Sequence, residues 1–145
     1  TDSLTLGIGY DRENCDSGSY HGEVHIDHYG RKVPKGAHGT IRLDPPSNLA
    51  GSLIQAASEL FEQITDPRLL VRRITITANR VVKDDGIYQL NLFTDTKKLE
   101  KEKKLQESML DIRKRFGKNA VLKGTSFLDG ATMRERNRQI GGHKA

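Results

Sequence analysis

Apolar and polar residues alternate along the first segment of the chain. The apolar residues at positions 4, 6, 8 and 10 are separated by Thr5, Gly7 and Gly9. Alternation with a period of two is typical of a strand that buries one face. Three further segments alternate in the same way, at positions 23–27, 40–43 and 73–78. The pattern therefore predicts four strands, and it predicts polypeptide loops over 11–22 and 29–39.

A different periodicity occupies the segment between the third and fourth predicted strands. Apolar residues recur at three- and four-residue spacing from about Leu49 to Ile64, which predicts an amphipathic helix. Ser47 and Asn48 are expected to cap its start, and Asp66-Pro67 to end it. The element order predicts an α+β fold, with an antiparallel sheet and a helix packed on one face. One helix covers only part of four strands, so a strand and a helix are expected upstream of Thr1.

The last third of the chain predicts a basic, mostly helical tail. Leu105, Met109, Ile112 and Phe116 form an apolar stripe on a helix of about four turns, with Gly117 as its C-cap. Residues 120–123 are expected to form a short strand and 131–140 a short helix. Residues 1–96 contain 10 Lys and Arg against 13 Asp and Glu, whereas 97–145 contain 14 against 6. The positive charge of the tail favours a polyanionic partner, although a solvated helix surface would give the same composition.

Composition bears on the cellular location of the protein. The chain of 145 residues has a single cysteine, so no disulfide can form within it. This favours a reducing, cytoplasmic location. No apolar run reaches the length of about 18 residues that a membrane span needs.

The search for catalytic motifs yields little. The sequence has no phosphate-binding GxxxxGK[ST] loop and no GxSxG elbow. Cys15, His21, His25 and His28 form a loose cluster whose spacing matches no standard zinc pattern. A metal-dependent enzyme built on this cluster is kept as a minor hypothesis, and loop and surface roles are the alternative.

Residue types that contact phosphate occupy the polar faces of the predicted strands. Thr40, Arg42, Arg73, Thr75 and Thr77 all lie opposite the apolar residues of their strands. Hydroxyl, guanidinium and backbone N–H groups are common contacts to a nucleic-acid backbone. The small residues Gly7 and Gly9 would let such a backbone approach closely. A plain solvated sheet face, with a bulge at the glycines, is the alternative.

A short apolar motif follows the acidic turn Asp84-Asp85-Gly86. Gln89-Leu90-Asn91-Leu92-Phe93 is too short for a core element and too apolar for an ordinary linker. Such a motif on an exposed connection predicts a protein partner. Packing against this chain's own body is the alternative. The expected organisation is a body at 1–83, a linker with the motif at 84–96, and the tail at 97–145.

The motif resembles the sliding-clamp-binding pentapeptide of bacterial DNA polymerases. The flanking chain is similar to the C-terminal part of Y-family, UmuC/DinB-like translesion polymerases, with residues 4–82 like most of the little-finger domain. The segment 94–145 resembles the tail of UmuC-like members from Gram-positive bacteria. The matching stretches are Ala131-Thr132-Met133-Arg134-Glu135-Arg136-Asn137 and Ile140-Gly141-Gly142-His143-Lys144.

The resemblance implies a four-stranded sheet with two helices on one face and DNA along the other. Leu4–Tyr10 would be the second strand of that domain. Gln89, Leu90, Leu92 and Phe93 would then bind the β sliding clamp. The Mg²⁺-binding catalytic domain of the family is not matched, so the chain alone is expected not to be an enzyme and to hold no cofactor. DNA-repair function follows as an expectation.

The charge of the body places a condition on DNA binding. The net acidity of residues 1–96 conflicts with DNA binding unless Arg42, Arg72, Arg73 and Lys83 cluster in space. A basic protein that binds nucleic acid through its tail alone is the competing hypothesis. An open sheet edge predicts a homodimer, unless residues 120–127 fold back to fill it.

Overall fold

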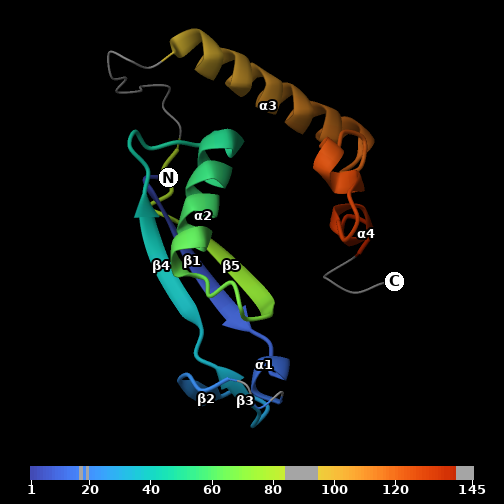
Figure 1. Cartoon of the computed structure of the whole chain (residues 1–145). Helices are drawn as coiled ribbons and strands as arrows, with labels where there is room; N and C mark the ends of the chain where they lie inside the picture. Colours follow the sequence, from blue (N-terminus) through green and yellow to red (C-terminus); the bar gives the residue numbers. More distant parts are fainter. Residues whose placement is uncertain (17, 19, 84–94, 140–145) are drawn as a thin grey trace. The chain divides into compact units, whose positions relative to one another are not determined.

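In a computed structural model of the chain, the described residues are 1–16, 18, 20–83 and 95–139. The chain divides into two units, Thr1–Leu92 and Phe93–Ala145. Figure 1 shows both units. None of the helices in the described ranges is long and apolar enough to cross a membrane.

The first unit is built on a three-stranded antiparallel sheet. Strand β1 (Ser3–Tyr10) is central, between β4 (Ala37–Arg42) and β5 (Val71–Asn79). Helix α2 (Ala50–Ile64) lies over β4 and β1 on one face of this sheet (Figure 1). The predicted α+β class and the predicted helix are confirmed.

The core lies between α2 and the apolar side of β1. Leu4, Leu6, Ile8 and Tyr10 are all buried there, with Leu60 of α2 among them. Gly39 of β4 allows the helix to pack closely, because a Cβ atom at this position would lie 3.0 Å from side-chain atoms of Leu60 and Ile64. The alternation of large apolar and small polar residues in β1 thus separates a buried face from an open one.

The start of α2 differs from the prediction. The N-cap position is Leu49, which provides no side-chain cap. Ser47 lies two residues before this N-cap. Its hydroxyl Oγ accepts a hydrogen bond from the Leu49 N–H at 3.1 Å. The proline pair at 45–46 places Ser47 before the first turn.

The prediction of a single four-stranded sheet is wrong. Strand β2 (Val24–Ile26) pairs with β3 (Lys32–Pro34) in a separate two-stranded sheet. Both β3 and the start of β4 lie in the segment that was predicted to be a loop. Val24 and Ile26 are exposed, so the weak alternation of β2 does not mark a core face.

A buried amide fixes this hairpin region to the main sheet. Asn14 lies in the short helix α1 (Glu13–Asp16), which packs on β3. Its side-chain amide donates to the carbonyls of Asp11 and Leu70 at 2.7 and 3.1 Å, and its oxygen accepts from the Leu70 N–H at 2.8 Å. These bonds join the segment after β1 to the residue that precedes β5.

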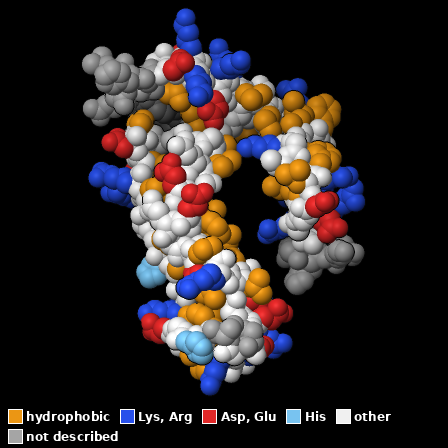
Figure 2. Space-filling view, viewed as in Figure 1, with side chains coloured by type: hydrophobic (Ala, Val, Ile, Leu, Met, Phe, Trp, Pro, Cys, Tyr) orange, Lys and Arg blue, Asp and Glu red, His pale blue; other side chains and the backbone are white. Residues whose placement is uncertain are grey.

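Strand β5 is only half covered. Ile74 and Ile76 pair with Ile8 and Leu6 and therefore share the face on which α2 lies. Yet they are 51% and 58% exposed, because α2 sits over β4 and β1. Figure 2 shows hydrophobic side chains beside α2 over this part of the sheet. The outer edge of β5 pairs with no strand among the described residues.

The second unit is helical and has no buried residue in its described elements. Helix α3 (Thr96–Phe116) is longer than predicted, and the side chain of Asp95 caps it by accepting from the Lys98 N–H. Gly117 is its C-cap at φ 93°, as predicted. The predicted strand at 120–123 is absent; the 3₁₀ helix η1 (Gly124–Phe127) follows instead. The predicted helix at 131–140 is only the short α4 (Met133–Arg136).

Candidate nucleic-acid interface

The face of the sheet opposite α2 carries rows of small polar side chains. Antiparallel register aligns Thr40, Thr5 and Thr77 across β4, β1 and β5. The hydroxyls of Thr5 and Thr40 are 2.8 Å apart, and the Asn79 amide donates to the Thr5 hydroxyl at 2.9 Å. We call this surface the outer face. The residues predicted to bind DNA all belong to it: Gly7, Gly9, Thr40, Arg42, Arg73, Thr75 and Thr77.

The outer face contains arginines and no carboxylate. Its strand residues are Ser, Thr, Gly, His, Asn and Arg only, from β1, β4 and β5. Arg42 aligns with Ser3 at one end, and Arg73 aligns with Gly9 at the other. From strand geometry these two backbones are about 22 Å apart, which corresponds to roughly six base pairs of a duplex.

The condition that Arg42, Arg72, Arg73 and Lys83 cluster is met only by Arg72 and Arg73. Arg72 and Arg73 lie together at the end of β1, where they line one pocket, but Arg42 lies at the far corner. Three carboxylates of the first unit lie in ion pairs with arginines, which leaves the net charge of the unit unchanged. Asp2 pairs with Arg80 at 2.6 Å, Asp11 with Arg72 at 3.2 Å and Asp66 with Arg68 at 2.7 Å.

Gly7 and Gly9 have no side chain, so nothing protrudes from β1 in the middle of the outer face. A Cβ atom at Gly7 would lie 3.9 Å from the Thr75 Cβ, and one at Gly9 would lie 3.6 Å from the Arg73 Cβ. Neither site is crowded by this chain, so packing within the sheet does not require glycine. The alternative of a bulge applies at Gly9, where the register with β5 shifts.

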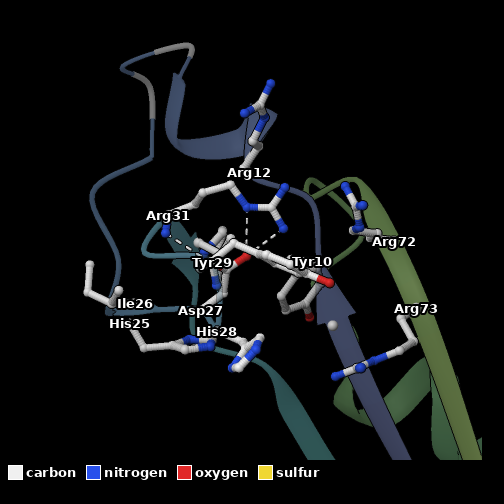
Figure 3. A pocket seen from close by; sticks show the side chains of 13 residues that line it. Tyr10, Arg12, His25, Ile26, Asp27, His28, Tyr29, Arg31, Arg72 and Arg73 are labelled. Carbon is white, nitrogen blue, oxygen red and sulfur yellow. Dashed lines mark hydrogen bonds and ion pairs between the residues drawn. The ribbon is translucent and has the colours of Figure 1, made fainter.

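A pocket of about 380 Å³ lies where the outer face meets the β2–β3 hairpin. Gly9 and Arg73 reach it from the sheet, and the hairpin supplies the opposite wall (Figure 3). Its charged lining residues are four arginines and one aspartate: Arg12, Arg31, Arg72, Arg73 and Asp27.

The turn of the hairpin is organised around Asp27. Its carboxylate accepts from the Arg31 guanidinium at 2.8 and 2.6 Å, and from the backbone N–H groups of Tyr29 and Arg31 at 2.9 and 3.0 Å. The hydrogen bonds from the Arg31 side chain lower the pKa of Asp27 from 3.8 to about 2, and those backbone N–H groups act in the same direction. Gly30 takes the positive φ of 76° that the turn needs.

Residues of this pocket were missed by sequence reasoning. Arg12, Tyr29 and Arg31 lie in segments that were interpreted as connecting loops, and Asp27 lies at the end of the second predicted strand. The one available signal was the Asp27–Arg31 spacing around Tyr-Gly, which is typical of a turn closed by an aspartate.

The other predicted sites have different outcomes. Within the described ranges, no group of three or more His, Cys, Asp or Glu side chains could hold a metal ion, so the hypothesis of a Cys15 and histidine site has no support there. The predicted clamp-binding residues Gln89, Leu90, Leu92 and Phe93 lie outside the described residues.

Comparisons with known proteins add an independent result. A protein named DNA polymerase IV 2 from Bacillus subtilis is 33% identical over 76% of this chain and 26% of its own length. Its namesake from Halalkalibacterium halodurans is 28% identical over 77% of this chain and 26% of its own length. The Bacillus subtilis protein UvrX, whose name refers to UV-damage repair, is 26% identical over 99% of this chain and 29% of its own length. No protein-family model and no solved structure matches the chain.

The chain is therefore a relative of two proteins named DNA polymerase IV 2 and of one protein named for UV-damage repair. More particularly, it is homologous to part of the Y-family polymerases, as the resemblance of its sequence indicated. It spans about a quarter of the length of the curated relatives that it matches.

The Asp27 turn gives a testable pH dependence. Because the pKa of the folded carboxyl group is about 2, below its usual 3.8, ionised Asp27 stabilises the turn above about pH 4. This contribution is lost as pH falls through 2. NMR titration of the Asp27 carboxyl group and of the Tyr29 and Arg31 amide protons should show one transition near pH 2. The Asp27→Asn variant should lack that transition, and a midpoint near 4 in the native chain would contradict this account.

Proposed function

We propose that this chain is the DNA-gripping and clamp-tethering region of a translesion DNA polymerase that acts in DNA repair in the cytoplasm. The observation that carries the proposal is the outer face, a carboxylate-free surface with hydroxyls along its middle and an arginine at each end. Homology to the Y-family polymerases supports DNA as the partner. Polymerisation and its Mg²⁺ belong, in this proposal, to the rest of the parent protein.

The outer face suits a duplex backbone for three physical reasons. Threonine hydroxyls and guanidinium groups donate hydrogen bonds to phosphate oxygens. The absence of carboxylates from the strands of this face avoids repulsion between like charges. The absence of side chains at Gly7 and Gly9 leaves room for a deoxyribose-phosphate chain to lie across β1. Contacts of this kind fix position on DNA and carry no sequence information, as a polymerase that follows any template requires.

Removing the positive charges of the outer face should weaken duplex binding in a salt-dependent way. Arg42→Gln and Arg73→Gln each remove one phosphate contact, so each should lower the slope of log affinity against log salt by about 0.9. Fluorescence anisotropy with a blunt duplex at several salt concentrations measures this slope.

The matched control is Arg68→Gln. Arg68 is exposed, lies in the loop before β5 and pairs with Asp66, away from the outer face. Its loss changes net charge equally and should leave the slope unchanged. Equal effects of all three substitutions would show that net charge, and not the outer face, determines binding.

The segment Gln89–Phe93 is proposed as the tether to the β sliding clamp. Leu92 and Phe93 would enter an apolar clamp pocket, Leu90 would lie beside them and Gln89 would anchor the peptide by hydrogen bonds. A few such residues commonly carry most of the affinity. Tethering raises the effective concentration of the polymerase at a primer end, because the second contact becomes intramolecular.

Leu92→Ala/Phe93→Ala should weaken clamp binding at least about thirtyfold, the effect of losing a binding hot spot. Isothermal titration of the full chain against the clamp measures it. Leu105→Ala/Phe116→Ala removes the same two residue types from exposed positions of α3 and should leave the affinity unchanged. Unchanged affinity in the first variant would remove the clamp from the proposal.

The basic tail supports a second candidate function, nucleic-acid binding through residues 97–145. Its excess of Lys and Arg is the observation in favour. DNA binding by a chain truncated after residue 96 distinguishes the two proposals. DNA binding through the outer face survives this truncation, whereas binding through the tail is lost.

We also propose that the open edge of β5 pairs with a second copy of the chain when no other segment covers it. Antiparallel pairing centred on Thr75 would place Ile74 of each copy opposite Ile76 of the other. Exposed edges and apolar faces favour such pairing.

Light scattering should then give twice the chain mass of 16.2 kDa at high concentration and a monomer on dilution. Ile74→Lys/Ile76→Lys should abolish the dimer, because charges that point inward block sheet extension. The control Val81→Lys/Val82→Lys changes exposed residues beyond β5 and should leave it intact. A monomer at every concentration would contradict the pairing.

A further inference from the structure

The outer face ends at the pocket beside the β2–β3 hairpin. Gly9 and Arg73 belong both to the last row of the outer face and to the pocket lining. A nucleic-acid strand that follows the outer face toward this end therefore meets the hairpin turn next. The hairpin stands beyond β1 and β4 in Figure 1, joined to β1 through α1 and to β4 through Pro34–Ala37.

Tyr29 at the tip of this hairpin is a large aromatic side chain presented to solvent. It is 77% exposed. The Arg31 guanidinium carbon lies 4.8 Å from its ring centroid, over one face of the ring, and His28 contacts it edge-on with centroids 5.4 Å apart. The backbone N–H of Tyr29 is held by Asp27 at 2.9 Å. The ring is thus positioned by its own turn, with one face covered by a cation and the rest open.

The pocket behind Tyr29 is cationic. Arg31 neutralises Asp27, so the single lining carboxylate adds no free negative charge. Arg72 pairs with Asp11 at 3.2 Å and Arg12 with Asp16 at 3.8 Å, and both guanidinium side chains remain more than half exposed. Arg73 takes part in no ion pair within the described part of the chain. In Figure 3 the Arg31 and Arg73 side chains extend into the region between sheet and hairpin, whereas Arg12 and Arg72 extend toward the top of the view, away from Asp27.

We propose that this pocket binds an unpaired nucleotide of a DNA strand as it leaves the duplex. The base stacks on Tyr29, and the flanking phosphates meet Arg73, Arg72 and Arg12. The inference rests on the proposed function, since the duplex must lie on the outer face for its single-stranded extension to reach the hairpin. An aromatic ring beside a cationic groove is the general means by which proteins hold single strands without reading their sequence.

Duplex phosphates alone would explain the arginines, but they would give no role to Tyr29. A duplex keeps its bases stacked inside, where an exposed ring cannot reach them without displacing one. The ring and the cations together fit a ligand with both a free base face and a phosphate. The contribution of Tyr29 therefore distinguishes an unpaired nucleotide from a simple extension of the duplex grip.

The test compares a blunt duplex with the same duplex that carries a single-stranded extension, using the full chain. Stacking of one base corresponds to about a tenfold change in affinity. Tyr29→Ala should weaken binding to the extended duplex by about that factor and leave the blunt duplex within twofold. A 2-aminopurine placed at the first unpaired position should be quenched by the native chain and by Tyr29→Phe, but not by Tyr29→Ala.

The second unit contains a matched control. Phe127 is also an exposed ring with an arginine over it, since the Arg134 guanidinium carbon is 5.2 Å from its centroid. Phe127→Ala should leave the affinities for both DNAs unchanged.

The outcomes separate the two proposals. If Tyr29→Ala weakens binding to both DNAs equally or to neither, or if 2-aminopurine is not quenched, the nucleotide site is overturned while duplex binding stands. If the native chain fails to bind the blunt duplex, the proposed function itself fails. Unchanged blunt-duplex binding by Tyr29→Ala would show that this variant is folded.

Discussion

The burial of one side of β1 under α2 is the interaction on which the first unit depends. Four large side chains from this strand fill the core, and each contributes on the order of 1.5–3 kcal/mol by leaving water. The same alternation leaves only Ser3, Thr5, Gly7 and Gly9 on the other side. A single strand therefore stabilises the unit and also presents its flattest surface. A shift of its register by one residue would exchange the core with the outer face.

The hairpin region adds a second kind of order, in which hydrogen bonds act together with the burial of Val33 and Pro34. Asn14 joins α1 to the start of β5, and Asp27 closes the turn that carries Tyr29. Both are short polar side chains that bond to backbone groups, and Asp27 also bonds to the Arg31 guanidinium, which is a usual way to hold an irregular segment. The hairpin thus keeps a defined position beside the sheet although β2 has no buried residue.

All four predicted strands occur as β1, β2, β4 and β5, and the predicted helix occurs as α2, but only β1 and α2 have an apolar pattern that coincides with burial. β1 alternates cleanly and α2 has a continuous stripe, so both follow from periodicity. The hairpin was misassigned because β3 is only Lys32-Val33-Pro34, too short to show alternation, and because β2 is exposed. Side-chain alternation also identified the outer-face residues. Tyr29 could not be found in this way, since its placement depends on a turn geometry set by Asp27 and on a pocket wall contributed by a distant strand.

Helix α3 has a consequence for how the chain loses structure. None of its residues is buried, so it is maintained by local forces: the Asp95 cap, the Gly117 terminus and the basic residues Arg113, Lys114 and Arg115 in its last turn. A helix supported in this way frays from its ends as temperature rises. The two units therefore differ in cooperativity: the first melts as one transition around β1, whereas helical signal from α3 fades over a broad range of temperature.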